Sequence, residues 1–99
     1  MLSFKYDSQL QMELAERAKK LRLLKALKRS SLAHHSGVSE ASIKRFESIG
    51  EISLKSLIKI ARALNSLDGI ENFFKVPEFK TLDDIRKLEK LKDRKRGVK

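Results

Sequence analysis

The chain has 99 residues, with 23 Lys and Arg against 13 Asp and Glu, which gives a formal net charge of +10. This length allows one hydrophobic core and excludes a large enzyme with a cleft between two domains. The absence of cysteine excludes disulfides and thiolate zinc sites. No apolar run approaches the roughly 20 residues of a membrane span, and no secretion signal is evident, so we expect a cytoplasmic protein. The positive charge predicts an anionic partner.

The first predicted helix begins near Asp7-Ser8, a candidate N-cap, and continues for about four turns. Before it, the alternation of apolar and polar residues at 1–6 fits either a short strand or a disordered arm. A second, short helix at residues 30–36 ends at Gly37, because glycine readily adopts the left-handed conformation that terminates helices. The apolar stripe of the first helix consists of Leu10, Leu14, Ala15, Ala18, Leu21 and Leu24.

The third predicted helix, at residues 40–48, follows a turn of only three residues, 37–39. The hydroxyl of Ser39 can cap its free amides, and Ile43 and Phe46 face inward. Gly50 closes the loop that follows. The sequence therefore predicts two short helices joined by a tight glycine-containing turn.

A fourth helix is capped by Ser53 and ends near Asn65, and a shorter fifth helix covers residues 68–74. Pro77 then interrupts the chain. Thr81 and Asp84 resemble a capping box at the start of a sixth helix. The buried side of the fourth helix is expected to contain Leu54, Leu57, Ile58, Ala61 and Leu64, and one side of the sixth Leu82, Ile85, Leu88 and Leu91.

The second helix, the turn and the third helix have the spacing of a helix-turn-helix, whose second helix enters the DNA major groove. Residues 14–74 resemble the Cro and phage-repressor class of helix-turn-helix proteins, the xenobiotic-response-element-like (XRE) family. The resemblance implies an all-α, five-helix, lambda-repressor-like domain, here followed by a C-terminal helix and basic tail. It rests on Leu32-Ala33, Gly37-Val38-Ser39, Ser42-Ile43-Lys44-Arg45-Phe46-Glu47, Ser53-Leu54, Leu57 and Ile60-Ala61-Arg62-Ala63-Leu64.

The resemblance makes residues 40–47 the recognition helix. Arg45 can donate two parallel hydrogen bonds to guanine, Lys44 can reach a guanine or a phosphate, and Ala41 can contact a thymine methyl. Glu40 can accept from a cytosine amino group or face solvent near the helix N-terminus. The DNA-binding residues implied are Lys28, Arg29, Ser39, Glu40, Ala41, Lys44, Arg45 and Ser48.

The sequence departs from the family at Lys28 and Arg29, where relatives have a small capping residue and a glutamine. Lysine cannot cap a helix, so we expect Ser30 or Ser31 to do so, and Arg29 to make a charged phosphate contact in place of a neutral one. Gly50 also lies one residue later than in many relatives. The resemblance therefore does not fix the geometry of this loop, and Ser48 is one option for a phosphate contact.

The resemblance also aligns Arg22 and Glu47 with a structural salt bridge between the first helix and the recognition helix. His34-His35 does not predict a metal site, because adjacent helical side chains diverge by about 100°. Asp83-Asp84 complements a helix dipole and is not accompanied by a histidine or a phosphate loop. We therefore expect no enzymatic activity, no metal and no cofactor.

The end of the fifth helix concentrates Phe73, Phe74, Val76 and Phe79. These residues fit either core filling or a two-fold dimer interface, and we favour the interface, because a small domain reads only half of an operator. The expected partners are therefore double-stranded DNA with a palindromic operator and a second copy of the chain.

The tail from Val76 to Arg96 resembles that of HipB-like antitoxins, which implies an autoregulating repressor, associated with the bacterial nucleoid, that binds a HipA-like kinase toxin. A tail that packs on the dimer or adds phosphate affinity fits as well. The sequence is also compatible with a phage or mobile-element repressor, or with a module that neutralises a toxin mainly through its last helix. We divide the chain into an arm (1–9), a DNA-binding domain (10–76) and a C-terminal helix with its basic tail (77–99).

Overall fold

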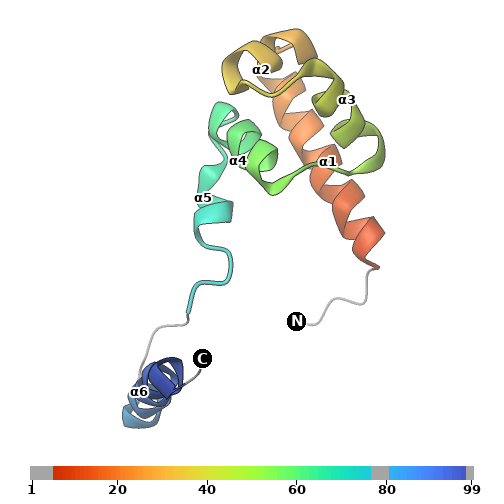
Figure 1. Cartoon of the computed structure of the whole chain (residues 1–99). Coiled ribbons are helices and arrows are strands. Elements are labelled where there is room, and N and C mark those ends of the chain that lie inside the picture. The colour runs from red at the N-terminus through yellow and green to blue at the C-terminus, as the bar shows by residue number, and fades with distance from the viewer. Residues whose placement is uncertain (1–5, 77–80, 98–99) are drawn as a thin grey trace.

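The computed structural model describes residues 6–76 and 81–97, and side chains as far as residue 94. The described part is all-α, as predicted, and contains no strand. Its helices are α1 (Asp7–Leu24), α2 (Arg29–Ser36), α3 (Glu40–Ile49), α4 (Leu54–Ala63), α5 (Leu67–Glu71) and α6 (Leu82–Gly97). Helices α1 to α4 form one group, and α6 lies away from it, beyond the end of α5 (Figure 1). The strand or disordered arm was predicted for residues 1–6, of which residues 1–5 lie outside the described part.

One apolar core joins α1 to α4. Leu32, Ile43 and Ile60, from three different helices, are each at most 2% exposed. The other buried apolar residues are Ala15, Val38, Phe46, Ala61 and Leu64. Burying residues of this size is the main favourable contribution to folding, and here it fixes α3 against α1 and α2.

Local capping chemistry sets five of the helix ends as predicted. Ser39 and Ser53 each accept a hydrogen bond from a backbone amide in the first turn of the helix that follows, at 3.1 Å. Gly37 and Gly50 end α2 and α3 with φ values of +76° and +74°. Before α6, Thr81 accepts from the amide of Asp84 at 3.2 Å.

Two of the predicted caps are wrong. Tyr6, and not Asp7 or Ser8, precedes α1, and its amide donates to Oε1 of Gln9 at 2.8 Å. Neither Ser30 nor Ser31 caps α2, because the helix begins one residue before Ser30 and both serines fall inside it. No side chain caps the N-terminus of α2.

Several apolar residues of the predicted stripes lie at the surface, and one of them, Leu54, was predicted to be buried. Leu24 and Leu54 are 77% and 69% exposed, because each lies at an end of its helix, beyond the edge of the core. On α6, Leu82 and Leu91 are also exposed. Helix α5 ends at Glu71, earlier than predicted, and Phe74 after it has a positive φ of 59°. The periodicity therefore located the helices better than it located the edges of the core.

Candidate nucleic-acid interface

The turn between α2 and α3 is held by three local features. Gly37 provides the left-handed residue, and a Cβ there would meet no atom within 4 Å, so the need for glycine is conformational. Val38 is 4% exposed and anchors the turn in the core, while its amide donates to Oγ of Ser36 at 3.1 Å. Ser39 then starts α3. These three features fix the angle between α2 and α3.

Helix α3 has one buried and one exposed face. Ile43, Phe46 and Glu47 point inward and are all at most 8% exposed. The predicted DNA-binding residues on this helix and at its cap are all exposed: Ser39, Glu40, Ala41, Lys44, Arg45 and Ser48. The structure therefore brings this set together on one accessible surface, which we call the α3 face.

The remaining two predicted contacts lie at the start of α2. Lys28 is exposed and precedes the helix, whereas Arg29, its first residue, is half-buried. Nε of Arg29 donates to Oε1 of Glu47 at 2.9 Å, with one third of the arginine side chain still exposed. Arg29 was assigned only to a phosphate, so its inward hydrogen bond is an additional role that the sequence analysis missed.

A buried ion pair joins α1 to α3. Arg22 donates from Nε to Oε2 of Glu47 at 2.7 Å and from Nη2 to Oε1 at 3.0 Å. Its Nη1 also donates to the carbonyl oxygen of Leu27 at 2.8 Å. Together with Arg29, these contacts make Glu47 the point at which α1, α2 and α3 meet, and we call the three charged residues the Glu47 cluster.

Two opposing effects act on the Glu47 carboxyl. Burial by itself would raise its pKa, because the charged form loses water. Hydrogen bonds from Arg22 and Arg29, together with their positive charges, outweigh burial and hold the pKa of Glu47 below the usual value of a glutamate. Glu47 is therefore ionised at neutral pH and is occupied by two arginines, so its role is structural.

The loop after α3 adds two contacts that the sequence did not predict. Gly50 packs against α1, where Nε2 of Gln11 donates to its carbonyl oxygen at 3.4 Å. Beyond it, Oε1 of Glu51 accepts from Nη2 of Arg45 at 2.6 Å. Both contacts depend on the path of the loop, which no local pattern in the sequence encodes.

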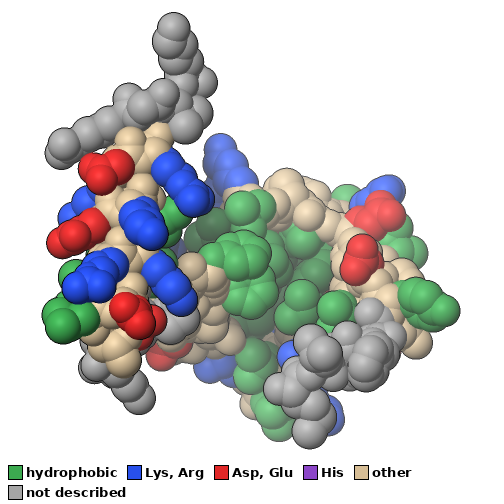
Figure 2. Space-filling view, turned by 90° about the horizontal axis from the view of Figure 1, so that it is seen from below, with side chains coloured by type: hydrophobic (Ala, Val, Ile, Leu, Met, Phe, Trp, Pro, Cys, Tyr) green, Lys and Arg blue, Asp and Glu red, His purple; other side chains and the backbone are tan. Residues whose placement is uncertain are grey.

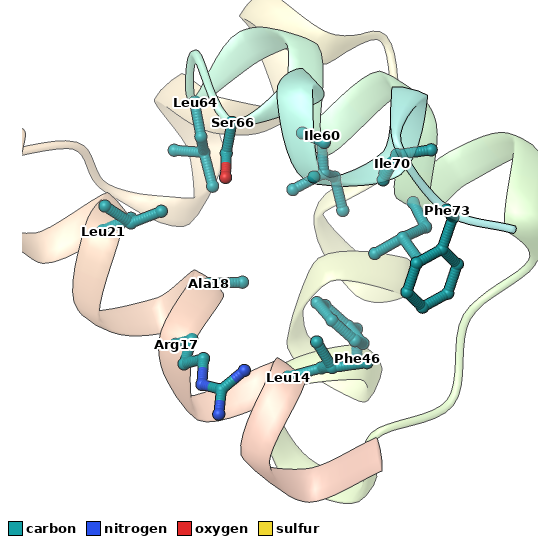
Figure 3. A pocket seen from close by; sticks show the side chains of 13 residues that line it. Leu14, Arg17, Ala18, Leu21, Phe46, Ile60, Leu64, Ser66, Ile70 and Phe73 are labelled. Carbon is teal, nitrogen blue, oxygen red and sulfur yellow. The ribbon is translucent and has the colours of Figure 1, made fainter. Parts of the chain in front are cut away.

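An apolar groove of about 320 Å³ lies on another side of the domain, between α1, α4 and α5. Leu14 and Leu21 of α1 face Ile60 and Leu64 of α4 across it, and Phe73 lies at its border (Figure 3). In the view from below, apolar side chains surround the hollow in the centre, and charged side chains of both signs follow α6 (Figure 2).

Phe73, Phe74 and Val76 are 70%, 95% and 62% exposed, so they do not fill the core of the single chain. Phe79, the fourth residue of the predicted dimer interface, lies outside the described residues.

Over the described part of the chain, no helix is both long and apolar enough to cross a membrane.

A helix-turn-helix whose second helix exposes lysine and arginine side chains defines a class of protein, the DNA-binding transcription regulators. Residues 19–72, more than half of the chain, match the family model HTH_3, described as helix-turn-helix, and the chain therefore belongs to this family, within the Cro and XRE class. The family is one of DNA-binding regulators and not of enzymes. No curated protein matches the chain significantly.

Proposed function

We propose that the protein is a sequence-specific repressor that binds a palindromic operator as a homodimer. We further propose that it is the autoregulating antitoxin of a HipBA-like operon, acting at the nucleoid in the bacterial cytoplasm. The observation that supports DNA recognition most directly is the α3 face. Ala41, Lys44 and Arg45 are exposed on a helix whose opposite side is fixed by Ile43 and Phe46 in the core.

Each residue of the α3 face has a distinct role in this proposal. Arg45 donates a pair of hydrogen bonds to O6 and N7 of a guanine, and Lys44 donates to a neighbouring guanine or phosphate. Ala41 contacts a thymine methyl group, and Ser39 and Ser48 contact the backbone at either end of the helix. Glu40, in the first turn of α3, complements the helix dipole or accepts from a cytosine amino group.

The start of α2 supplies the phosphate contacts. Lys28 is exposed, and Arg29 combines a side chain that is one third exposed with an inward hydrogen bond to Glu47. A guanidinium has five N–H donors, so one that binds Glu47 keeps others for a phosphate oxygen. This arrangement ties the phosphate contact to the position of α3.

The test of sequence recognition is selection from a pool of random duplexes by the full chain. Arg45→Ala is expected to lower the preference for the selected duplex by about 1 to 3 kcal/mol, because it removes a bidentate base contact. Lys28→Ala is expected to weaken all duplexes equally and to reduce the salt dependence. A chain that selects no sequence would contradict the proposed function, and equal weakening by Arg45→Ala would contradict the role of Arg45.

The homodimer is supported by the apolar surface at the end of α5. Phe74 is 95% exposed and has a positive φ, a conformation that costs a non-glycine residue roughly 1 to 2 kcal/mol. Phe73 beside it borders the apolar groove. In the proposed two-fold dimer, the aromatic residues and the groove of one copy are buried against those of the other. The two α3 helices then lie about 34 Å apart.

Sedimentation measures the dimer directly. We expect a dimer at micromolar concentration and a monomer for Phe74→Ser, with the helical content unchanged because the Phe74 side chain is exposed. A wild-type chain that sediments as a monomer both with and without DNA contradicts the dimer.

The antitoxin role is supported by α6. Leu82, Ile85 and Leu91 are 72%, 44% and 58% exposed on a helix that lies away from the core, as expected of a segment that binds another protein. We expect the chain to bind a HipA-like kinase encoded in the same operon. Removal of residues 77–99 is expected to abolish kinase binding and to preserve DNA selection. The opposite result would favour a chain whose α6 acts at the DNA.

A further inference from the structure

Glu51 lies beside Arg45 at the end of the recognition helix. The Nη2 group of Arg45 donates to Oε1 of Glu51 at 2.6 Å, and the two side chains are 64% and 53% exposed. The backbone that leads to Glu51 is constrained, because Gly50 has a φ of +74° and its Cα position lies so close to α1 that an added Cβ would meet Gln11 at 3.0 Å. The fold therefore places this carboxylate next to the arginine of the α3 face.

An ion pair this exposed contributes little to folding, because water screens the attraction and two long side chains lose freedom. Its consequence lies in what Arg45 can bind. The Nη2 group has two hydrogens, so one can stay on Glu51 while another faces a guanine. The edge of a guanine presents O6 and N7 as neutral acceptors, and these are compatible with a carboxylate nearby.

A backbone phosphate differs from a guanine in its charge. A phosphate within reach of Arg45 would also lie near Glu51, where two negative groups repel each other. Glu51 therefore opposes the sequence-independent attraction of Arg45 to DNA and leaves base reading by the same side chain intact. Discrimination by an unfavourable contact of this kind is a common source of specificity.

We propose that Glu51 is a specificity-determining residue, which limits Arg45 to contacts with base edges by neutralising it against backbone phosphates. The inference rests on the proposed function, because it assumes that the α3 face binds duplex DNA.

The experiment compares two duplexes of equal length, one selected by the full chain from a random pool and one with the same bases scrambled. Affinities are measured by fluorescence anisotropy over a series of salt concentrations. In Glu51→Gln, Arg45 becomes free to bind one additional phosphate. The affinity for the scrambled duplex is expected to rise about 8-fold at 0.1 M salt, with a salt slope steeper by about 0.9. The selected duplex gains less, so the preference falls.

Two matched variants separate this effect from a change in net charge. Glu16→Gln removes an equal charge from an exposed position on α1 and is expected to leave the salt slope unchanged. In an Arg45→Ala background, Glu51→Gln is expected to have no effect on the scrambled duplex. These results together support the inference.

The inference is overturned if Glu51→Gln behaves as Glu16→Gln does, or if its effect persists without Arg45. When either occurs in a chain that still selects a sequence through Arg45, the proposed function stands and only the role of Glu51 is wrong. A wild-type chain that selects no sequence overturns both.

Discussion

Helices α1 to α4 and the segment of α5 and α6 use apolar residues in opposite ways. In the first group Leu32, Ile43 and Ile60 are buried, and even two charged residues, Arg22 and Glu47, are at most 8% exposed. In the second group no residue of α5 is buried, and Phe74 just after it is almost fully exposed. The first group determines the shape of the domain, and the second exposes the apolar residues that we propose for association. Four experiments test the packing on which this difference depends.

The largest effect is expected for Arg22→Ala. It leaves Glu47 buried with one arginine and removes the donor to Leu27, so we expect the free energy of unfolding to fall by about 3 to 5 kcal/mol. Urea denaturation followed by circular dichroism measures this. Arg45→Ala, which breaks an exposed pair, is the control and should cost less than about 1 kcal/mol. Equal losses in the two variants would contradict the structural role of the Glu47 cluster.

A pair of identical substitutions compares the two groups directly. Leu32→Ala creates a cavity in the core and should cost about 2 to 5 kcal/mol, since Leu32 is 1% exposed. Leu91→Ala on α6 removes a side chain that is 58% exposed and should change the free energy of unfolding by less than about 0.5 kcal/mol. A comparable loss at Leu91 would show that α6 packs on the domain.

Two glycines with nearly the same φ provide a finer test. Gly50→Ala must bear both a left-handed conformation and a Cβ 3.0 Å from the backbone of Gln11, and should cost about 1 to 3 kcal/mol. Gly37→Ala bears only the conformation, because the space around it is open, and should cost about 1 kcal/mol. The difference between the two variants in thermal unfolding measures the loss of stability caused by the close approach of Gly50 to α1. Equal losses would show that α1 moves to accommodate the added Cβ.

The smallest effect concerns pH. The pKa of Glu47 is lower in the folded chain than in the unfolded one, where it is about 4.5, so its contribution to stability is complete only well above that pH. As pH falls from there through the lower folded pKa, the contribution is lost, because protonation favours the unfolded chain. We expect the free energy of unfolding to fall more steeply below about pH 5 in the wild type than in Glu47→Gln. Parallel curves would contradict the lowered pKa.

Local chemistry explains why much of the fold could be predicted. Ser39, Ser53, Gly37 and Gly50 act on the residues next to them, so the sequence alone identified these helix ends. The start of α2 could not be predicted in the same way. Lys28 takes the capping position without a side-chain hydrogen bond, and the helix is held there by Leu32 in the core.

The candidate site was predictable only where the family resemblance covers it. The α3 face followed from the alignment of residues 40–47. The sequence did not predict that Arg29 binds Glu47 or that Glu51 binds Arg45, because both contacts depend on the distances between separate elements. Arg29 stands where the family resemblance implies a neutral residue, and this departure was the signal that an additional charge had to be accommodated.

The division of α3 into two faces has a consequence for how such a regulator can change over time. Glu47, Ile43 and Phe46 are buried and stabilise the fold, whereas Ala41 and Lys44 are exposed. Mutations at these outward positions can therefore accumulate without unfolding the domain. A duplicated gene could thus acquire a different target in a few steps while the fold that presents α3 stays unchanged.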